Sequence, residues 1–217
     1  MNPHEHRRRK TKPVNRFYRC CHRIAHFYLW LFFGINVVGE ENIPSGASMV
    51  CANHSSILDP FIIAVAFGIS RNVHVIAKAE LYKIPVVSQI LKKLEMIRVD
   101  RGVLDTATVR TTFDYLKRGE IVVIFPEGTR VSEDETVAAK TGAIKIAERC
   151  SVPIVPLFIP RKKPVFRKIQ VVIGEPYNIE KQTGKRSAED YSDLSAHLME
   201  RIKSLDPGAL LRSASKN

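Results

Sequence analysis

A histidine and an aspartate lie close together in the segment Asn53-His54-Ser55-Ser56-Ile57-Leu58-Asp59-Pro60. An imidazole held by a carboxylate is a general-base pair: the ring takes a proton from a hydroxyl, and the carboxylate fixes the ring tautomer and stabilises the imidazolium that forms. A turn between the two residues would fold His54 back toward Asp59. A simpler interpretation is that Asp59 only caps a helix and His54 is a loop residue. This segment alone favours neither.

Two further segments carry arginine, Ile97-Arg98-Val99-Asp100-Arg101-Gly102 and Phe125-Pro126-Glu127-Gly128-Thr129-Arg130. Arg101 and Arg130 suit a phosphate, because a guanidinium offers charged donors in a bidentate fork. Gly128 lets the backbone pass close to a ligand. Glu127 cannot favour a phosphate itself, so we expect it to orient an arginine or to accept from a hydroxyl. Taken singly, each segment is also explained as a charged turn.

Short β-branched runs alternate with helical segments from residue 47 onward. We expect strands at 48–52, 73–77, 96–99, 120–125, 154–159 and 169–173, and helices at 58–67, 85–94, 103–117, 138–149 and 187–204. This alternation predicts an α/β fold with a largely parallel central sheet flanked by helices. Ligands of such sheets bind outside the carboxyl ends of the strands. Since each of the three segments follows an expected strand, together they predict a hydroxyl-activating base beside a phosphate clamp.

Four segments, in order, resemble the blocks of the glycerolipid acyltransferases, and in particular the bacterial 1-acylglycerol-3-phosphate acyltransferase type. They are residues 53–59, 97–101, 125–130 and Val152-Pro153-Ile154-Val155-Pro156. The resemblance extends from about residue 48 to residue 160. It implies the transfer of a fatty acyl group from a thioester to a hydroxyl of a phosphate-bearing glycerolipid.

The resemblance also implies roles for individual residues. The catalytic base is His54, and Asp59 is its orienting partner. Phosphate and acceptor binding fall on Arg101, Glu127, Gly128, Thr129 and Arg130, and Lys140 and Gly142 resemble a Lys-x-Gly-Ala element that lines the same pocket. Val131 stands where many members carry Ser, which affects the local acceptor contacts, and 152–156 is expected to wall the acyl tunnel without a catalytic role.

The mechanism expected from these residues is direct acyl transfer without a metal or redox cofactor. The acceptor is 1-acylglycerol-3-phosphate and the product phosphatidic acid, with another lysophospholipid or glycerol-3-phosphate as the alternative acceptor. The donor is acyl-CoA or acyl carrier protein, used as a co-substrate. A covalent serine mechanism is disfavoured, because the Gly-x-Ser-x-Gly elbow is absent. The basic runs Arg161-Lys162-Lys163 and Arg167-Lys168 either meet the carrier's phosphates or form a solvated loop.

The formal net charge is +12, which points to an anionic partner. No nucleic-acid module is recognisable and the aromatic residues cluster in one apolar run, so we expect no nucleic acid. A non-catalytic basic membrane-binding protein would leave the His54, Asp59 and Arg130 arrangement unexplained. A phosphohydrolase using His and Asp as metal ligands would need more ligands than these segments offer.

Residues 1–40 hold eight Lys or Arg against two Glu, and within them the basic stretch Arg7 to Lys12 is followed by the apolar, aromatic run 24–38. About 15 helical residues span roughly 22 Å, short of the ~30 Å hydrocarbon core. We therefore expect an amphipathic helix lying on an anionic membrane, with a packed core helix as the alternative. The predicted organisation is a membrane-associating segment at 1–40 and one acyltransferase domain at 41–217. The predicted location is the cytoplasmic face of the cell membrane, peripheral or monotopic, and the four cysteines are expected to be free thiols.

Overall fold

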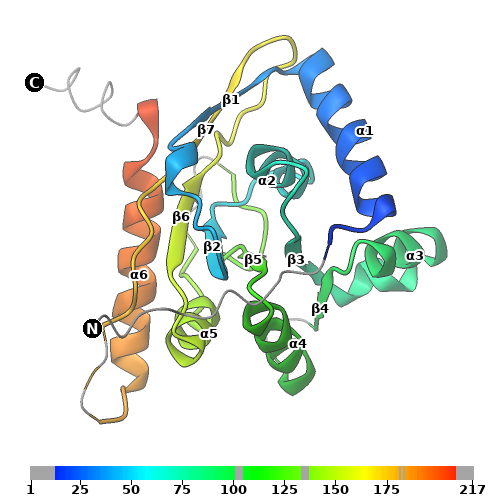
Figure 1. Ribbon diagram of the computed structural model, residues 1–217. Coiled ribbons are helices and arrows are strands. Elements are labelled where there is room, and N and C mark those ends of the chain that lie inside the picture. Colours follow the sequence, from blue (N-terminus) through cyan, green and yellow to red (C-terminus); the bar gives the residue numbers. More distant parts are fainter. Residues whose placement is uncertain (1–12, 101–104, 133–136, 181, 183, 209–217) are drawn as a thin grey trace, which may run out of the picture.

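The computed structural model describes residues 13–100, 105–132, 137–180, 182 and 184–208, and these form one sheet with helices on both faces (Figure 1). The strands are Ile35–Val38 (β1), Ser48–Ala52 (β2), Val73–Lys78 (β3), Ile97–Val99 (β4), Ile121–Ile124 (β5), Ile154–Phe158 (β6) and Ile169–Ile173 (β7). Their order across the sheet is β1-β7-β6-β2-β5-β3-β4. All neighbouring pairs are parallel except β6–β7, which is antiparallel. The expected α/β fold with a largely parallel sheet is confirmed.

The α-helices of the described residues cover the sheet in two layers. They are Arg16–Phe32 (α1), Asp59–Phe67 (α2), Pro85–Lys93 (α3), Thr106–Lys117 (α4), Gly142–Cys150 (α5) and Ala188–Ser204 (α6), and two 3-10 helices, Glu40–Asn42 (η1) and Ala79–Lys83 (η2), complete the set. Successive side chains of a strand point to opposite faces. Val50 and Ala52 of β2 therefore pack with residues of α1 and α2, whereas Met49 and Cys51 pack with residues of α4, α5 and α6. Because β2 is covered on both faces, all its residues are buried.

The N-terminal apolar run divides into a helix and a strand, and the strand was not predicted from the sequence. Helix α1 ends at Phe32, Gly34 takes a positive φ of 61°, and β1 then pairs in parallel with β7. Residues 35–38 are thus an edge strand of the sheet and not a continuation of a membrane helix. Among the described residues, no helix is both long enough and apolar enough to cross a membrane.

The expected strands agree with the structure to within one residue, whereas the helix starts agree less well. Helix α5 begins at Gly142 and not at residue 138, because the Lys140 N–H donates to the carbonyl of Pro126 at 2.9 Å and holds this stretch against the loop after β5. The N-cap of α2 is Leu58 and not Asp59, since the Asp59 carboxylate turns back toward the preceding loop. The sequence-based expectation that Asp59 caps this helix was wrong.

Candidate active site

Three loops meet where the adjacent strands β6, β2 and β5 end at their carboxyl sides. The Asn53 side chain donates to the Ile159 carbonyl at 2.7 Å and accepts from the Ile159 N–H at 2.8 Å, which joins the loops after β2 and β6. The Val131 N–H donates to the His54 carbonyl at 2.8 Å, which joins the loops after β2 and β5. Because the strands are parallel and hydrogen-bonded, these contacts bring side chains far apart in sequence to one edge of the sheet.

His54 and Asp59 form the expected pair. Nδ1 of His54 lies 2.9 Å from Oδ2 of Asp59, and the same oxygen accepts from the N–H groups of Ser55 at 2.7 Å and Ser56 at 2.8 Å. Asp59 is fully buried, whereas the His54 side chain is 18% exposed. A carboxylate oxygen that already accepts two backbone N–H groups requires a donor on the imidazole, so we place the His54 proton on Nδ1.

This tautomer leaves Nε2 of His54 with a lone pair. Nε2 has no hydrogen-bond partner among the described residues. The Phe125 ring stacks on the imidazole with centroids 4.1 Å apart, and the His54 N–H donates to Oε2 of Glu127 at 2.7 Å. The ring is therefore held from its face, its backbone and its Nδ1 side, and its free nitrogen is the one suited to take a proton from a ligand.

Asp59 is ionised in this arrangement. Burial alone raises the pKa of its carboxyl, but the hydrogen bond from His54, the charge of Lys163 and the N–H of Ser55 outweigh burial and hold the pKa below its ordinary value. Nζ of Lys163 lies 2.9 Å from Oδ1 of Asp59. Oδ1 has no hydrogen bond of good geometry among the described residues, so this contact is an ion pair rather than a directed hydrogen bond.

The residues expected to bind phosphate fall into two groups. Glu127 is buried and accepts from the His54 N–H and from Nη2 of Arg161, the latter at 2.7 Å, so it orients an arginine, one of the two roles expected for it. Thr129 and Arg130 are exposed at the same loop, and Arg130 makes no hydrogen bond or ion pair with the described residues. Arg101 lies outside the described residues.

Gly128 and Lys140 are brought together by this loop. Gly128 has a φ of 68°, and a Cβ built on it would stand 2.6 Å from Cε of Lys140. The lysine side chain therefore passes directly over the glycine, and the positive φ at this position favours a residue without a Cβ. The two residues that the family resemblance assigned to one pocket are in contact.

The basic run after β6 does not behave as either sequence interpretation expected. Arg161 pairs with Glu127, and Lys163, only 6% exposed, pairs with Asp59. These two side chains point into the protein and are neither a solvated loop nor free to meet a carrier's phosphates. Arg167 and Lys168 are exposed. Sequence reasoning missed the inward contacts of Arg161 and Lys163 and the stacking of Phe125, because none of them follows from local spacing.

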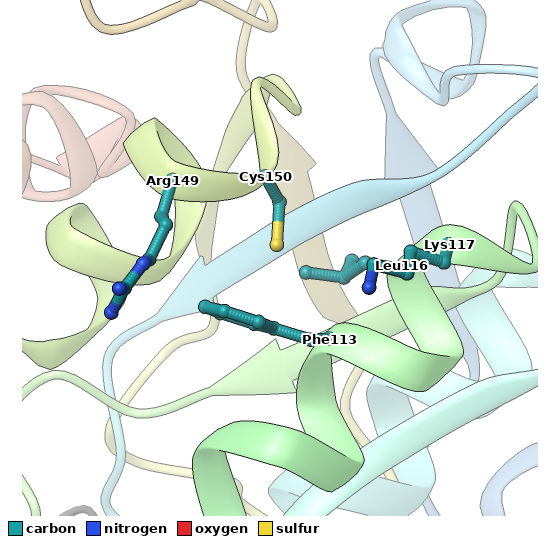
Figure 2. A pocket seen from close by; sticks show the side chains of 5 residues that line it. All are labelled: Phe113, Leu116, Lys117, Arg149 and Cys150. Carbon is teal, nitrogen blue, oxygen red and sulfur yellow. The ribbon is translucent and has the colours of Figure 1, made fainter.

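One pocket lies far from this site. It has a volume of about 300 Å³ and is lined by Phe113, Leu116 and Lys117 of α4 and by Arg149 and Cys150 of α5 (Figure 2). Both helix ends lead into the starts of strands β5 and β6, so the pocket is at the edge of the sheet opposite to His54. Among the described residues, no three His, Cys, Asp or Glu side chains gather as metal ligands would.

The fold and this site define a class of enzyme. The family model described as Acyltransferase matches residues 34–160, more than half of the chain, and the protein belongs to this acyltransferase family. The family expected from the four sequence blocks is confirmed.

Individual relatives indicate which kind of acyltransferase the chain is similar to. The 1-acyl-sn-glycerol-3-phosphate acyltransferase of Bacillus subtilis (strain 168) is 34% identical over 196 residues, which cover 87% of this chain and 96% of the relative. A probable 1-acyl-sn-glycerol-3-phosphate acyltransferase of Mycoplasma pneumoniae is 34% identical over 72% of this chain and 67% of its own. The crystal structure of the 1-acyl-sn-glycerophosphate (LPA) acyltransferase PlsC from Thermotoga maritima has a TM-score of 0.65 at 28% identity, covering 87% of this chain and 78% of that one.

Proposed function

We propose that this protein transfers a fatty acyl group from a thioester donor to the free hydroxyl of 1-acylglycerol-3-phosphate and so forms phosphatidic acid. The observation that carries the proposal is the His54–Asp59 pair, with Nδ1 of His54 2.9 Å from the carboxylate and Nε2 without a protein partner among the described residues. The names of the relatives support the same acceptor. The alternative acceptors are another lysophospholipid and glycerol-3-phosphate.

The proposed chemistry is direct transfer. Nε2 of His54 takes the proton of the acceptor hydroxyl while the oxygen attacks the thioester carbonyl carbon. A C–O ester bond forms, the C–S bond breaks, and the proton passes from His54 to the leaving thiolate. Asp59 stabilises the imidazolium that exists between the two proton transfers, since its carboxylate is ionised and contacts Nδ1.

We assign acceptor phosphate binding to exposed cations beside the base. Arg130 has an unpaired guanidinium among the described residues, and Lys140 lies over Gly128 in the same loop region. Arg101 is proposed for this role from the sequence alone, and Thr129 offers a hydroxyl donor. Glu127 contributes indirectly, because it holds Arg161 and the His54 backbone. The donor, acyl-CoA or acyl carrier protein, meets the chain at the same edge of the sheet.

We further propose that α1 holds the enzyme on an anionic membrane surface at the cytoplasmic face of the cell membrane. The helix packs on α2 through buried Tyr18, His22 and Leu29. Its other side exposes large apolar side chains: Ile24, Phe27, Tyr28, Trp30 and Leu31. Aromatic side chains beside basic ones are typical of helices that lie in a lipid interface.

Apolar side chains from other elements extend this surface. Phe166 is 79% exposed, takes a φ of 63° and packs its ring 6.2 Å from Phe32 at the end of α1. Ile84 and Val86 at the start of α3 are also exposed, and the other end of α3 contacts the start of α1, where the Asn15 side chain donates to the Lys93 carbonyl. Transfer of an exposed phenylalanine ring from water to an apolar environment is favourable, which supports the burial of Phe166 in lipid.

The test is acceptor-dependent release of thiol by the purified protein, with palmitoyl-CoA and 1-acylglycerol-3-phosphate in mixed micelles. His54→Ala is expected to lower turnover at least about a hundredfold, because it removes the general base. An unchanged unfolding midpoint of this variant serves as the control for folding. Near-normal turnover by His54→Ala would contradict the mechanism. If the protein turns over another lysophospholipid or glycerol-3-phosphate but not 1-acylglycerol-3-phosphate, the acceptor is the compound that reacts and the proposed one is wrong.

A further inference from the structure

Lys163 is a lysine that the proposed mechanism does not use, although it lies in the site. Its side chain is 6% exposed, in the loop between β6 and β7. Burying an ammonium is costly unless it is paired and hydrogen-bonded. A buried lysine at the edge of an active site therefore indicates that its contacts have a specific role.

Lys163 contacts oxygens of its own loop and of the turn that carries the base. Nζ donates to Oγ of Ser55 at 2.9 Å, to the Pro160 carbonyl at 2.8 Å and to the Arg161 carbonyl at 3.4 Å, and it forms an ion pair with Oδ1 of Asp59 at 2.9 Å. Ser55 follows His54 directly and Asp59 contacts its ring, so Lys163 ties the loop after β6 to both ends of the turn that carries the base.

The two oxygens of Asp59 are divided between two partners. Oδ2 accepts from His54 and from the backbone of Ser55 and Ser56, whereas Oδ1 faces only Lys163. With Lys163 in place, a rotation that turns the carboxylate plane away from the imidazole would also break the contact with the ammonium. Lys163 thus limits Asp59 to one orientation, and Asp59 limits His54 to one tautomer.

The charges around His54 form two pairs. Asp59 contacts the ring and is paired with Lys163, and Glu127 contacts the His54 backbone and is paired with Arg161. Arg130 and Lys140 are the further charged residues in the described part of the loop after β5, and both are assigned to the acceptor phosphate. Each carboxylate that touches His54 therefore has its own cation from the segment 161–163, so the imidazole is held by negative oxygens without an excess of negative charge.

We propose that Lys163 is a positioning residue of the acyl-transfer reaction, which fixes the Asp59 carboxylate and offsets its charge, so that His54 is held in one orientation with Nε2 directed at the acceptor. This inference rests on the proposed function, since it concerns how the base is prepared. Without Lys163, an uncompensated carboxylate beside the ring favours the imidazolium, which cannot accept the proton of the acceptor.

The experiment compares Lys163→Met with Lys163→Arg and with two controls from the same segment. We expect the acidic limb of the pH profile of kcat/KM to move toward higher pH by roughly one unit in Lys163→Met, so that activity well below the limb falls by about tenfold and recovers in alkaline buffer. Lys163→Arg retains the charge, and its limb stays at the wild-type position. Lys162→Met and Arg167→Met each remove an exposed cation from the same loop, and neither moves the limb.

A second readout does not need turnover. NMR detection of the His54 ring across the same pH range is expected to show its titration moving upward in Lys163→Met relative to the wild type. The comparison is repeated in an Asp59→Asn background, where no carboxylate charge is left to offset and Lys163→Met shifts the titration little. If Lys163→Met alone does not fold, the double variant Lys163→Met/Asp59→Asn is measured in its place, because it has no buried carboxylate charge left without a partner.

The outcomes separate this inference from the proposed function. A uniform loss of kcat at every pH, with an unchanged His54 titration, would overturn it and leave Lys163 as a structural contact. An upward His54 titration in a protein that shows no acyl transfer with any acceptor would support the positioning role and reject the proposed function. If Lys163→Met shifts the His54 titration equally in the wild-type and the Asp59→Asn backgrounds, the inference is also overturned.

Discussion

Three cations of this site have different environments, and their expected roles differ accordingly. Lys163 and the half-buried Arg161 pair with carboxylates, whereas Arg130 is exposed and makes no ion pair with the described residues. Arg161 donates to the Val131 carbonyl and to Glu127, and Lys163 donates to Ser55 and to the Pro160 carbonyl, so these donors are used within the protein. No described residue accepts from the Arg130 guanidinium, so we propose that Arg130 binds the ligand.

We expect Arg130→Lys to raise KM for the phosphorylated acceptor about tenfold, because the charge remains while the bidentate fork is lost. The unfolding midpoint should not change, since Arg130 has no protein partner among the described residues. Steady-state kinetics at varied acceptor concentration measure the effect. A KM equal to that of the wild type would exclude the arginine from the clamp.

Asp59 gives a prediction for acid stability. Although burial acts to raise its pKa, its hydrogen bonds and Lys163 hold that pKa below the ordinary value. A pKa lowered by folding means that ionised Asp59 stabilises the fold above about pH 4, the unfolded value, and that this contribution is lost as the pH falls through the folded value. Urea unfolding at several pH values should therefore show a steeper acid loss for the wild type than for Asp59→Asn. Parallel curves would contradict this origin of the acid dependence.

At the element scale, α1 has two sides with opposite environments. Leu29 is 1% exposed and belongs to the core, whereas Trp30, the next residue, is 66% exposed. Both interpretations drawn from the sequence, a packed helix and an interfacial helix, are therefore compatible with the same element. The buried side explains the position of the helix, and the exposed aromatic side remains the basis for proposing a membrane contact.

The double variant Phe27→Ser/Trp30→Ser should weaken binding to vesicles that contain phosphatidylglycerol by at least about tenfold. Each exchange removes a large apolar side chain from the proposed lipid contact, and burying such a side chain contributes about 1.5–3 kcal/mol. Vesicle co-sedimentation measures the binding, and equal unfolding midpoints would establish that the fold is intact. Retention of full binding would show that α1 is not the anchor.

Local patterns predict elements better than they predict element boundaries in this chain. Strands β2 and β6 are buried on both faces, so they are short apolar runs between turn residues and are predicted correctly. Strand β1 was missed, because only Phe33 and Gly34 separate it from an apolar helix and its partner β7 lies far along the chain. The start of α5 was misplaced for a similar reason, since a contact with Pro126 keeps residues 138–141 out of the helix.

The candidate site, like the fold, was predicted from the sequence only in part. His54 and Asp59 are near neighbours in sequence, and local spacing was sufficient to pair them. Lys163 and Arg161 reach the same site only through the order of strands in the sheet, which places β6 beside β2. No spacing rule in one sequence indicates which basic residues turn inward, so the ion pairs with Asp59 and Glu127 were found only in the structure.

At the scale of the whole molecule, the N-terminal residues are part of the folded unit. β1 pairs with β7, and Leu29 and Phe33 lie in the core cluster with residues of β2, α2 and β6. The boundary expected at residue 40 would therefore cut an edge strand and a core helix away from the sheet.

Deleting residues 1–40 is expected to destabilise the protein by several kcal/mol, because the deletion opens the sheet edge and removes buried side chains from the core. Deleting residues 1–14 retains Asn15, which accepts from the Tyr18 N–H as the cap of α1, and should change the unfolding midpoint by only a few degrees. Thermal unfolding followed by circular dichroism compares the two. Equal midpoints would mean that the first forty residues fold separately.

The antiparallel pairing of β6 and β7 affects where the sequence of such a protein can vary during evolution. A parallel neighbour requires a crossover that passes over a face of the sheet, whereas the loop between the antiparallel strands β6 and β7 begins and ends at one edge of the sheet, the edge where β2 leads into the His54 turn. Beyond Lys163, this loop can gain or lose residues without displacing a strand or a covering helix. The connection at 164–168 is thus where insertions could alter substrate preference while the catalytic turn is inherited unchanged.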